Sequence, residues 1–81
     1  MSSDQIRHLI AVLFLGGDES IPIANDLDLT AAGICDSFAL LELAMAIEQK
    51  MSLHHIPDSD VTVQNFGSID RIMGYLSART S

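Results

Sequence analysis

The sequence predicts an all-α protein, a small four-helix bundle of three main helices and one short helix with a long ordered loop between helices one and two. Apolar residues recur at intervals of three and four over most of the chain, and no stretch alternates with a period of two for long enough to form a strand. Hydrophobic residues make up 48% of the 81 positions. Such a chain can bury a core without disulfides or metal, and we expect one domain over residues 1–81.

The first helix is expected over Ser3–Leu15. Ser2 and Gln5 have the spacing of a capping box, in which each side chain accepts a hydrogen bond from the other residue's backbone. Two consecutive glycines at positions 16 and 17 end the helical pattern. Its apolar positions are Ile6, Leu9, Ile10 and Leu13.

Residues 16–36 show no clear periodicity. A connection of about 20 residues without structure is uncommon in a compact domain unless it is a functional loop. We expect an ordered loop with a turn at Leu29–Ala32, fixed to the core by apolar residues spaced along it. These residues are Ile21, Ile23, Leu27, Leu29 and Ile34.

The second helix is expected over Ser37–Met51, a stretch without glycine or proline that is rich in Leu, Ala, Met, Glu and Gln. At about 100° per residue, one apolar stripe gathers on the side that must face the core. That stripe consists of Leu40, Leu43, Ala44, Ile47 and Met51.

A second apolar stripe lies on another side of the same helix, where Phe38, Leu41 and Met45 are interleaved with Ser37 and Glu48. A helix on the outside of a bundle needs only one apolar stripe. Either the long loop or the last helix covers this second stripe, or it is a partly exposed surface for a partner. We expect Phe38 to turn toward the core, and Leu41 and Met45 to be exposed.

The C-terminal part begins with the stretch "IPDSDVT", which favours one short helical turn. The last helix is expected to follow Asn65 as its N-cap. Arg71 and Arg79 are expected toward its C-terminal half, where positive charge suits the helix dipole. Its apolar face consists of Phe66, Ile69, Ile72, Met73 and Leu76.

The net charge of −7 argues against nucleic acid as a partner, because a phosphate backbone would be repelled. No lysine or arginine occurs from His8 to Gln49. This acidic surface is either a solvated face or a docking face for basic partners, and charge alone does not decide between them. The acids of this stretch are Asp18, Glu19, Asp26, Asp28, Asp36, Glu42 and Glu48.

The location expected for the protein is the cytoplasm. The first ten residues lack a basic leader, and Cys35, the one cysteine, cannot form an internal disulfide. The longest apolar run, Leu9–Leu15, is far shorter than the roughly 20 residues that span a bilayer. We therefore expect no membrane association.

Asp36 and Ser37 open the second helix. Asp36 is a natural N-cap, which places Ser37 at the first helical position. A phosphate ester on Ser37 would lie beside the free N–H groups at the positive end of the helix. Ser37 is therefore a candidate for covalent modification.

The arrangement as a whole resembles the acyl and peptidyl carrier proteins. The stretches that carry the resemblance are "DLDLTAAGICDSFALLELAMAIEQ" and "IPDSDVTVQNFGSIDRIMGYL". They contain a lead-in of apolar and acidic residues, a glycine, an Asp-Ser-hydrophobe motif, a helix rich in Leu, Glu and Ile, a short helix and a last helix. The similarity extends from about Ile6 to Leu76, in the order and spacing of that family.

The resemblance implies a freestanding, monomeric carrier that is not itself an enzyme. Ser37 would bear a 4′-phosphopantetheine arm, donated by coenzyme A through a separate phosphopantetheinyl transferase. Acyl or aminoacyl groups would be held as thioesters and presented to ligases, acyltransferases or synthases. The positions implied for partner docking are Asp36, Phe38, Leu41, Glu42, Met45, Glu48, Asp58 and Asp60.

Some positions depart from fatty-acid carriers, which usually have leucine after the serine and more acids on the second helix. Here Phe38 follows Ser37, and Gln49 and Lys50 stand where acids are common. These residues favour secondary-metabolite biosynthesis, of a polyketide or a nonribosomal peptide. The alternatives are a D-alanyl-type or fatty-acid carrier and, in a different class, a helical interaction module without the arm.

Two metal-like patterns are weak. His54 and His55 are adjacent and close to Asp58, but neighbouring loop residues rarely point the same way and no cysteine joins them. A calcium-type loop starting at Asp26 would have alanine rather than glycine at its sixth position and Ser37 rather than glutamate at its twelfth. We expect no metal site.

Enzymatic roles are also disfavoured. No G-x-S-x-G motif surrounds Ser37, and a small helical bundle offers no evident oxyanion hole for a hydrolase triad. Cys35 is either a reactive thiol or, more often for such a residue, a small apolar filler of the loop.

Overall fold

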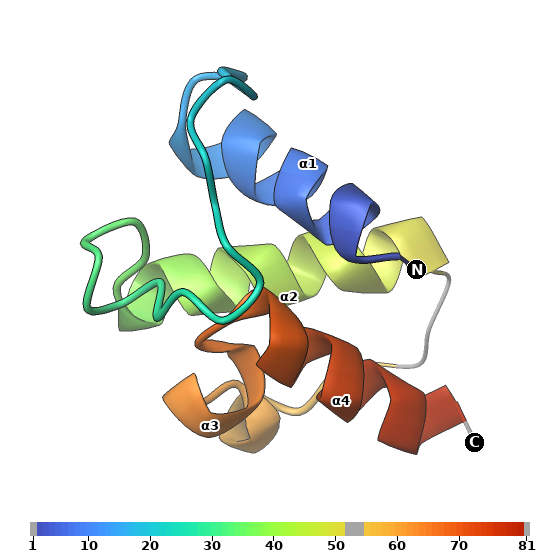
Figure 1. Cartoon of the computed structure of the whole chain (residues 1–81). Helices are drawn as coiled ribbons and strands as arrows, with labels where there is room; N and C mark the ends of the chain where they lie inside the picture. The colour runs from blue at the N-terminus through green and yellow to red at the C-terminus, as the bar shows by residue number, and fades with distance from the viewer. Residues whose placement is uncertain (1, 52–54, 81) are drawn as a thin grey trace.

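The computed structural model describes residues 2–51 and 55–80, which form four α-helices and one 3₁₀ turn and contain no strand. Three helices are long and one is short. The short helical turn expected in "IPDSDVT" is the 3₁₀ turn at Asp58–Asp60, and the short helix at Val63–Phe66 is a further element that the sequence analysis did not separate from the last helix. Helix α1 packs against α2 and α4, and α3 packs against the same two helices (Figure 1). The elements are α1 (Ser3–Phe14), α2 (Ser37–Met51), η1 (Asp58–Asp60), α3 (Val63–Phe66) and α4 (Ile69–Thr80).

The core stripe predicted for α2 is confirmed. Leu40, Leu43, Ala44 and Ile47 are buried, and Met51 is partly buried at the end of the helix. Residues from the other elements complete one continuous core. They are Ile6, Leu9, Ile10, Ile23, Leu29, Cys35, Ile56, Phe66, Ile69, Ile72 and Leu76.

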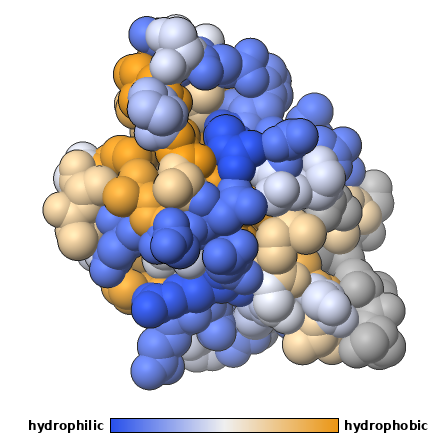
Figure 2. All heavy atoms as spheres, viewed as in Figure 1, coloured by the Kyte–Doolittle hydropathy of each residue, from blue (hydrophilic) through white to orange (hydrophobic). Residues whose placement is uncertain are grey.

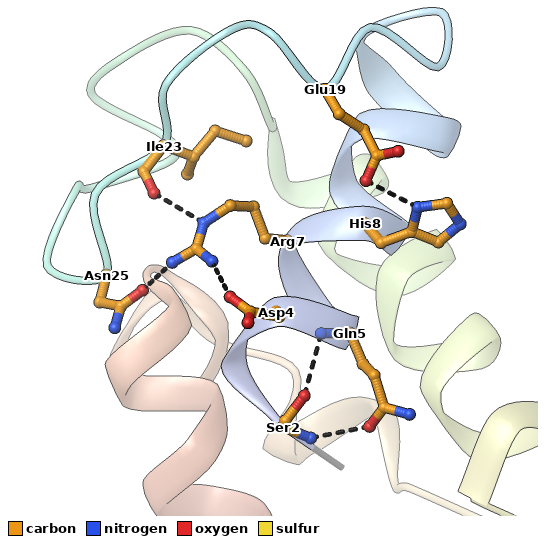
Figure 3. Close-up of polar contacts among 8 residues, drawn as sticks. All are labelled: Ser2, Asp4, Gln5, Arg7, His8, Glu19, Ile23 and Asn25. Carbon is orange, nitrogen blue, oxygen red and sulfur yellow. Dashed lines mark hydrogen bonds and ion pairs between the residues drawn. The ribbon is translucent and has the colours of Figure 1, made fainter.

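Helix α1 begins with the predicted capping box (Figure 3). The backbone N–H of Gln5 donates to Ser2 Oγ at 3.2 Å, and the N–H of Ser2 donates to Gln5 Oε1 at 2.8 Å. The helix ends at Phe14, one residue before the predicted end. Leu13 was assigned to the apolar face but is exposed, whereas the smaller Ala11 lies in the core.

The segment between α1 and α2 is ordered by core contacts and by backbone hydrogen bonds. Ile23 and Leu29 are buried as predicted, but Ile21 is exposed. The predicted turn after Leu29 is present, and it closes at Gly33 with a φ of 77°. The backbone N–H of Leu29 donates to the carbonyl of Gly67 at 2.7 Å, which joins the loop to the end of α3.

Arg7 clamps the same segment to α1 (Figure 3). Its Nε donates to the carbonyl of Ile23 at 3.0 Å, and its Nη2 donates to the side-chain oxygen of Asn25. Asp4 holds the guanidinium from the other side at 2.5 Å. The carbonyl of Asn25 in turn accepts from Asp70 N at 2.9 Å, so the loop is tied to both α1 and α4.

The start of α4 differs from the prediction. Asn65 lies inside α3, whose N-cap is Thr62, and does not cap the last helix. Helix α4 starts after Ser68, whose hydroxyl accepts from the N–H of Arg71 at 3.1 Å. The backbone between the two helices requires glycine at position 67, because a Cβ there would come within 2.3 Å of the Val63 carbonyl oxygen.

Arg71 is therefore in the first turn of α4 and not in its C-terminal half. Its Nη1 donates to the Val63 carbonyl at 3.0 Å, which satisfies an acceptor in α3 instead of complementing the end of α4. Arg79 lies in the last turn, as predicted. No helix in the described part of the chain is long and apolar enough to cross a membrane.

Candidate functional site

Ser37 opens α2 and its side chain faces solvent. Asp36 caps the helix as predicted, since its Oδ1 accepts a hydrogen bond from the N–H of Ala39 at 2.7 Å. Ser37 is exposed, and its hydroxyl makes no hydrogen bond to any residue that the structure describes. An anion on this oxygen would lie at the positive end of the helix, where N–H groups have no helical acceptor.

The second apolar stripe of α2 is exposed in part. Phe38 is 67% exposed and Met45 is 55% exposed, whereas Leu41 is half-buried. The expectation that Phe38 turns toward the core is wrong, because Leu40 takes the core position at this end of the helix. The expected exposure is confirmed for Met45 and only partly met by Leu41.

A groove of about 210 Å³ runs along this stripe, between α2 and the segment 55–61. Apolar side chains form most of its surface, and four titratable side chains stand around them. The apolar residues are Phe38, Leu41, Ala44, Met45, Ile56 and Val61. The titratable residues are Glu42, Glu48, His55 and Asp58.

The groove brings together most of the positions predicted for docking but adds a wall that the sequence did not point to. Ile56 and Val61, on either side of η1, form this wall. Asp60 points elsewhere, since its Oδ2 accepts from the hydroxyl of Tyr75 at 2.7 Å and lies 3.8 Å from Nη1 of Arg79. The apolar residues flanking "PDSD" were the available signal for this wall.

The two glutamates of α2 differ in their surroundings. Glu42 makes no side-chain hydrogen bond or ion pair within residues 2–51 and 55–80. Glu48 is only 20% exposed, and its Oε1 lies 2.5 Å from the N–H of Ile56 and 3.4 Å from Nδ1 of His55. Both side chains are partly buried, and of the two Glu42 is the acid without a side-chain contact among the described residues.

Cys35, two residues before Ser37, is buried in the core. Burial, and to a smaller degree the nearby charge of Asp36, raises the pKa of its thiol to about 11. These surroundings favour an apolar filler over a reactive thiol.

We expect Cys35 to react slowly with iodoacetamide at pH 8. Because its pKa is about 11 against an ordinary 9.0, the thiolate fraction falls by about 100-fold, and burial slows the reaction further. Intact mass spectrometry would follow alkylation of the native chain and of the chain unfolded in urea. Equal rates in both would show that Cys35 is accessible and reactive.

Metal-binding residues do not gather in the part of the chain that the structure describes, where no cluster of three or more His, Cys, Asp or Glu side chains could hold an ion. His54 lies outside the described residues. Nδ1 of His55 lies 3.4 Å from Oε1 of Glu48.

A larger hollow of about 620 Å³ lies at the other end of α2, beside Lys50 and Met51. Its polar groups on α1 are already engaged. Asp4 pairs with Arg7, Gln5 belongs to the capping box, and His8 Nδ1 lies 2.9 Å from a Glu19 carboxylate oxygen (Figure 3). The described residues that line this hollow therefore present no converging set of free polar groups.

Hydrophobic residues also gather where the end of α1 meets the loop, as Figure 2 shows in the view of Figure 1. Partly buried residues contribute there to the edge of the core, among them Phe14 and Leu15. Hydrophilic residues cover the centre of the face in this view. Nothing in the structure shows what would cover this apolar edge.

Comparisons with protein-family models, curated proteins and solved structures find no match to this chain. The functional assignment therefore depends on the residues of the site: the free serine, its helix terminus and the adjoining groove.

Proposed function

We propose that the protein is a freestanding acyl or aminoacyl carrier whose Ser37 bears a 4′-phosphopantetheine arm. The observation that carries this proposal is the free, exposed hydroxyl of Ser37 at the start of α2, between the capping Asp36 and the exposed Phe38. The order of helices, with a long ordered loop before α2 and a short helix before α4, is consistent with the small four-helix bundle of carrier proteins.

The attachment chemistry needs only what Ser37 offers. Its hydroxyl oxygen forms a bond to phosphorus as a P–O bond in the diphosphate of coenzyme A breaks, and the nucleotide bisphosphate leaves. The serine proton passes to the transferase. The product is a phosphodiester anion at the helix N-terminus, a place that stabilises negative charge.

The surroundings of Ser37 favour modification by a separate enzyme over catalysis by this chain. A serine nucleophile needs a general base within hydrogen-bond reach, and that base is oriented by a third group. The hydroxyl of Ser37 contacts no such base among the described residues. The geometry therefore gives no support to a Ser-His-Asp hydrolase triad at Ser37.

The docking face fits partners in secondary-metabolite biosynthesis better than those of fatty-acid synthesis. Fatty-acid carriers rely on a densely acidic second helix, whereas here Glu48 is engaged internally and Glu42 is the one free acid that α2 itself contributes to the described lining of the groove. Phe38 and Met45 add exposed apolar surface. A polyketide or nonribosomal peptide pathway is the first candidate, and a D-alanyl-type carrier is the second.

The test is a mass measurement. The protein is incubated with coenzyme A and a promiscuous phosphopantetheinyl transferase, and its intact mass is determined. We expect the gain of one phosphopantetheine group per chain. No gain in the wild-type protein would overturn the carrier assignment and would favour a helical interaction module without the arm.

We expect Glu42→Lys to slow this modification about tenfold at low ionic strength, because the variant places a repulsive charge where a basic partner docks. Raising the salt concentration should shrink the difference, since exposed charges are screened. The initial rate of mass gain measures the effect. Asp26→Lys, which makes the same charge change outside the groove, is the control, and equal rates for the two variants would contradict an acidic docking surface at Glu42.

A further inference from the structure

Glu48 belongs by its position to the face of α2 that partners would meet, but its carboxylate is turned to the segment that follows the helix. Its Oε1 accepts the backbone N–H of Ile56 at 2.5 Å. The same oxygen lies 3.4 Å from Nδ1 of His55, and the side chain is 20% exposed. A carboxylate used in this way stabilises a backbone position and is a poor contact for a partner.

The hydrogen bond to Ile56 links the groove wall to α2. Ile56 is 1% exposed and lies in the core cluster. The next residue, Pro57, has an extended backbone and no N–H to donate. A hydrogen bond with an ionised acceptor is shorter and about twice as strong as a neutral one. Glu48 therefore holds the segment at Ile56 and Pro57 through the backbone N–H of Ile56.

The other side of the wall is anchored on α4. Tyr75 donates to Asp60 Oδ2 at 2.7 Å, and Arg79 Nη2 donates to the carbonyl of His55 at 3.4 Å. The Arg79 guanidinium also lies 5.6 Å from the centre of the Tyr75 ring. With α4 holding one side, loss of the Glu48 contact would release the wall on the side that faces α2.

We propose that Glu48 is a positioning residue that closes the groove beside Ser37 by holding Ile56 against α2. When this hydrogen bond is lost, the segment 55–61 moves away from α2 and the partly buried apolar surface of Leu41 and Val61 becomes accessible. The inference rests on the proposed function for its biological meaning, because the groove adjoins the serine that would bear the arm. The bond and its effect on the groove concern the unmodified chain.

Amide hydrogen exchange of Ile56, measured by NMR on the unmodified full chain, tests the proposal. We expect Ile56 to be protected in the wild type. Glu48→Gln, which keeps a neutral acceptor, should raise its exchange rate a few-fold, and Glu48→Ala should raise it about 10–100-fold. Glu42→Gln and Glu42→Ala are the matched controls on the same helix and should leave the Ile56 rate unchanged.

Groove access is measured separately with the neutral dye Nile red, whose fluorescence rises on apolar surface. We expect Glu48→Ala to bind more dye than Glu42→Ala, while the amide of Ile10 in α1 keeps its protection in both. If the alanine variant does not fold, dye binding is compared between Glu48→Gln and Glu42→Gln instead, and the first should bind more dye.

An unprotected Ile56 amide in the wild type, or equal exchange in the Glu48 and Glu42 variants, would overturn the proposal. Neither readout requires the arm. A chain that gains no phosphopantetheine but shows the graded Ile56 response would lose the proposed function and keep this inference. A chain that gains phosphopantetheine but shows no change in Ile56 exchange would keep the proposed function and lose this inference.

Discussion

Replacing Ser37 with alanine is expected to abolish the gain of phosphopantetheine completely while leaving the fold intact. The side chain of Ser37 makes no hydrogen bond to a described residue, and the cap of α2 comes from Asp36. Alanine is a good helix former at such an exposed position, so the free energy of unfolding should change by no more than about 0.5 kcal/mol. Intact mass after incubation with coenzyme A and transferase gives the first result, and urea unfolding gives the second.

Ser59→Ala is the matched control for this variant. Ser59 is an exposed serine within η1, between two residues that were expected to contact partners. This variant should gain the same mass as the wild type. A mass gain that persists in Ser37→Ala would place the attachment elsewhere and would remove the central residue of the carrier proposal.

The parts of the fold that sequence analysis predicted are those governed by contacts within a few residues. The capping box of Ser2 and Gln5 and the cap at Asp36 both join residues three positions apart, and both are present. The core stripe of α2 follows from helical spacing alone, and its central residues are buried. Spacing and capping chemistry are therefore sufficient to locate these helices.

The break between α3 and α4 was missed for a related reason. Phe66, Ile69 and Ile72 are three residues apart and all are buried, so the apolar pattern runs through the break as if one helix continued. The break depends on Gly67, where a side chain would collide with the Val63 carbonyl, and on the new cap at Ser68. Apolar periodicity does not report such a change in helix direction.

The roles of the side chains on α2 were the least accessible to sequence analysis. A helical wheel assigns Glu42 and Glu48 to a surface, but not the residues that come to meet them. Glu48 differs from Glu42 because it accepts a hydrogen bond from the N–H of Ile56, which lies eight positions later in the chain and on the opposite wall of the groove. The inward orientation expected for Phe38 is wrong for a similar reason, because Leu40 takes the core position at this end of the helix.

Phe66→Ala is expected to lower the free energy of unfolding by about 3–5 kcal/mol. The ring of Phe66 is fully buried, and its centre lies 5.0 Å from that of Tyr75 at an angle of 51°. Removing it leaves a cavity where α3 meets the core and also removes a favourable aromatic contact. A domain of this size is stable by only about 5–15 kcal/mol, so urea unfolding should show a large shift of the midpoint.

Phe38→Ala makes the same chemical change on the surface and should have the opposite pattern of effects. Because Phe38 is 67% exposed, the free energy of unfolding should change by no more than about 0.5 kcal/mol. The rate of phosphopantetheine transfer should fall about tenfold, since an exposed aromatic side chain beside Ser37 is suited to anchor a docked partner. A large loss of stability in this variant would mean that the ring is buried in solution, and an unchanged rate would mean that partners do not contact it. The pair of substitutions thus separates the aromatic residue that holds the fold together from the one that is free to serve the site.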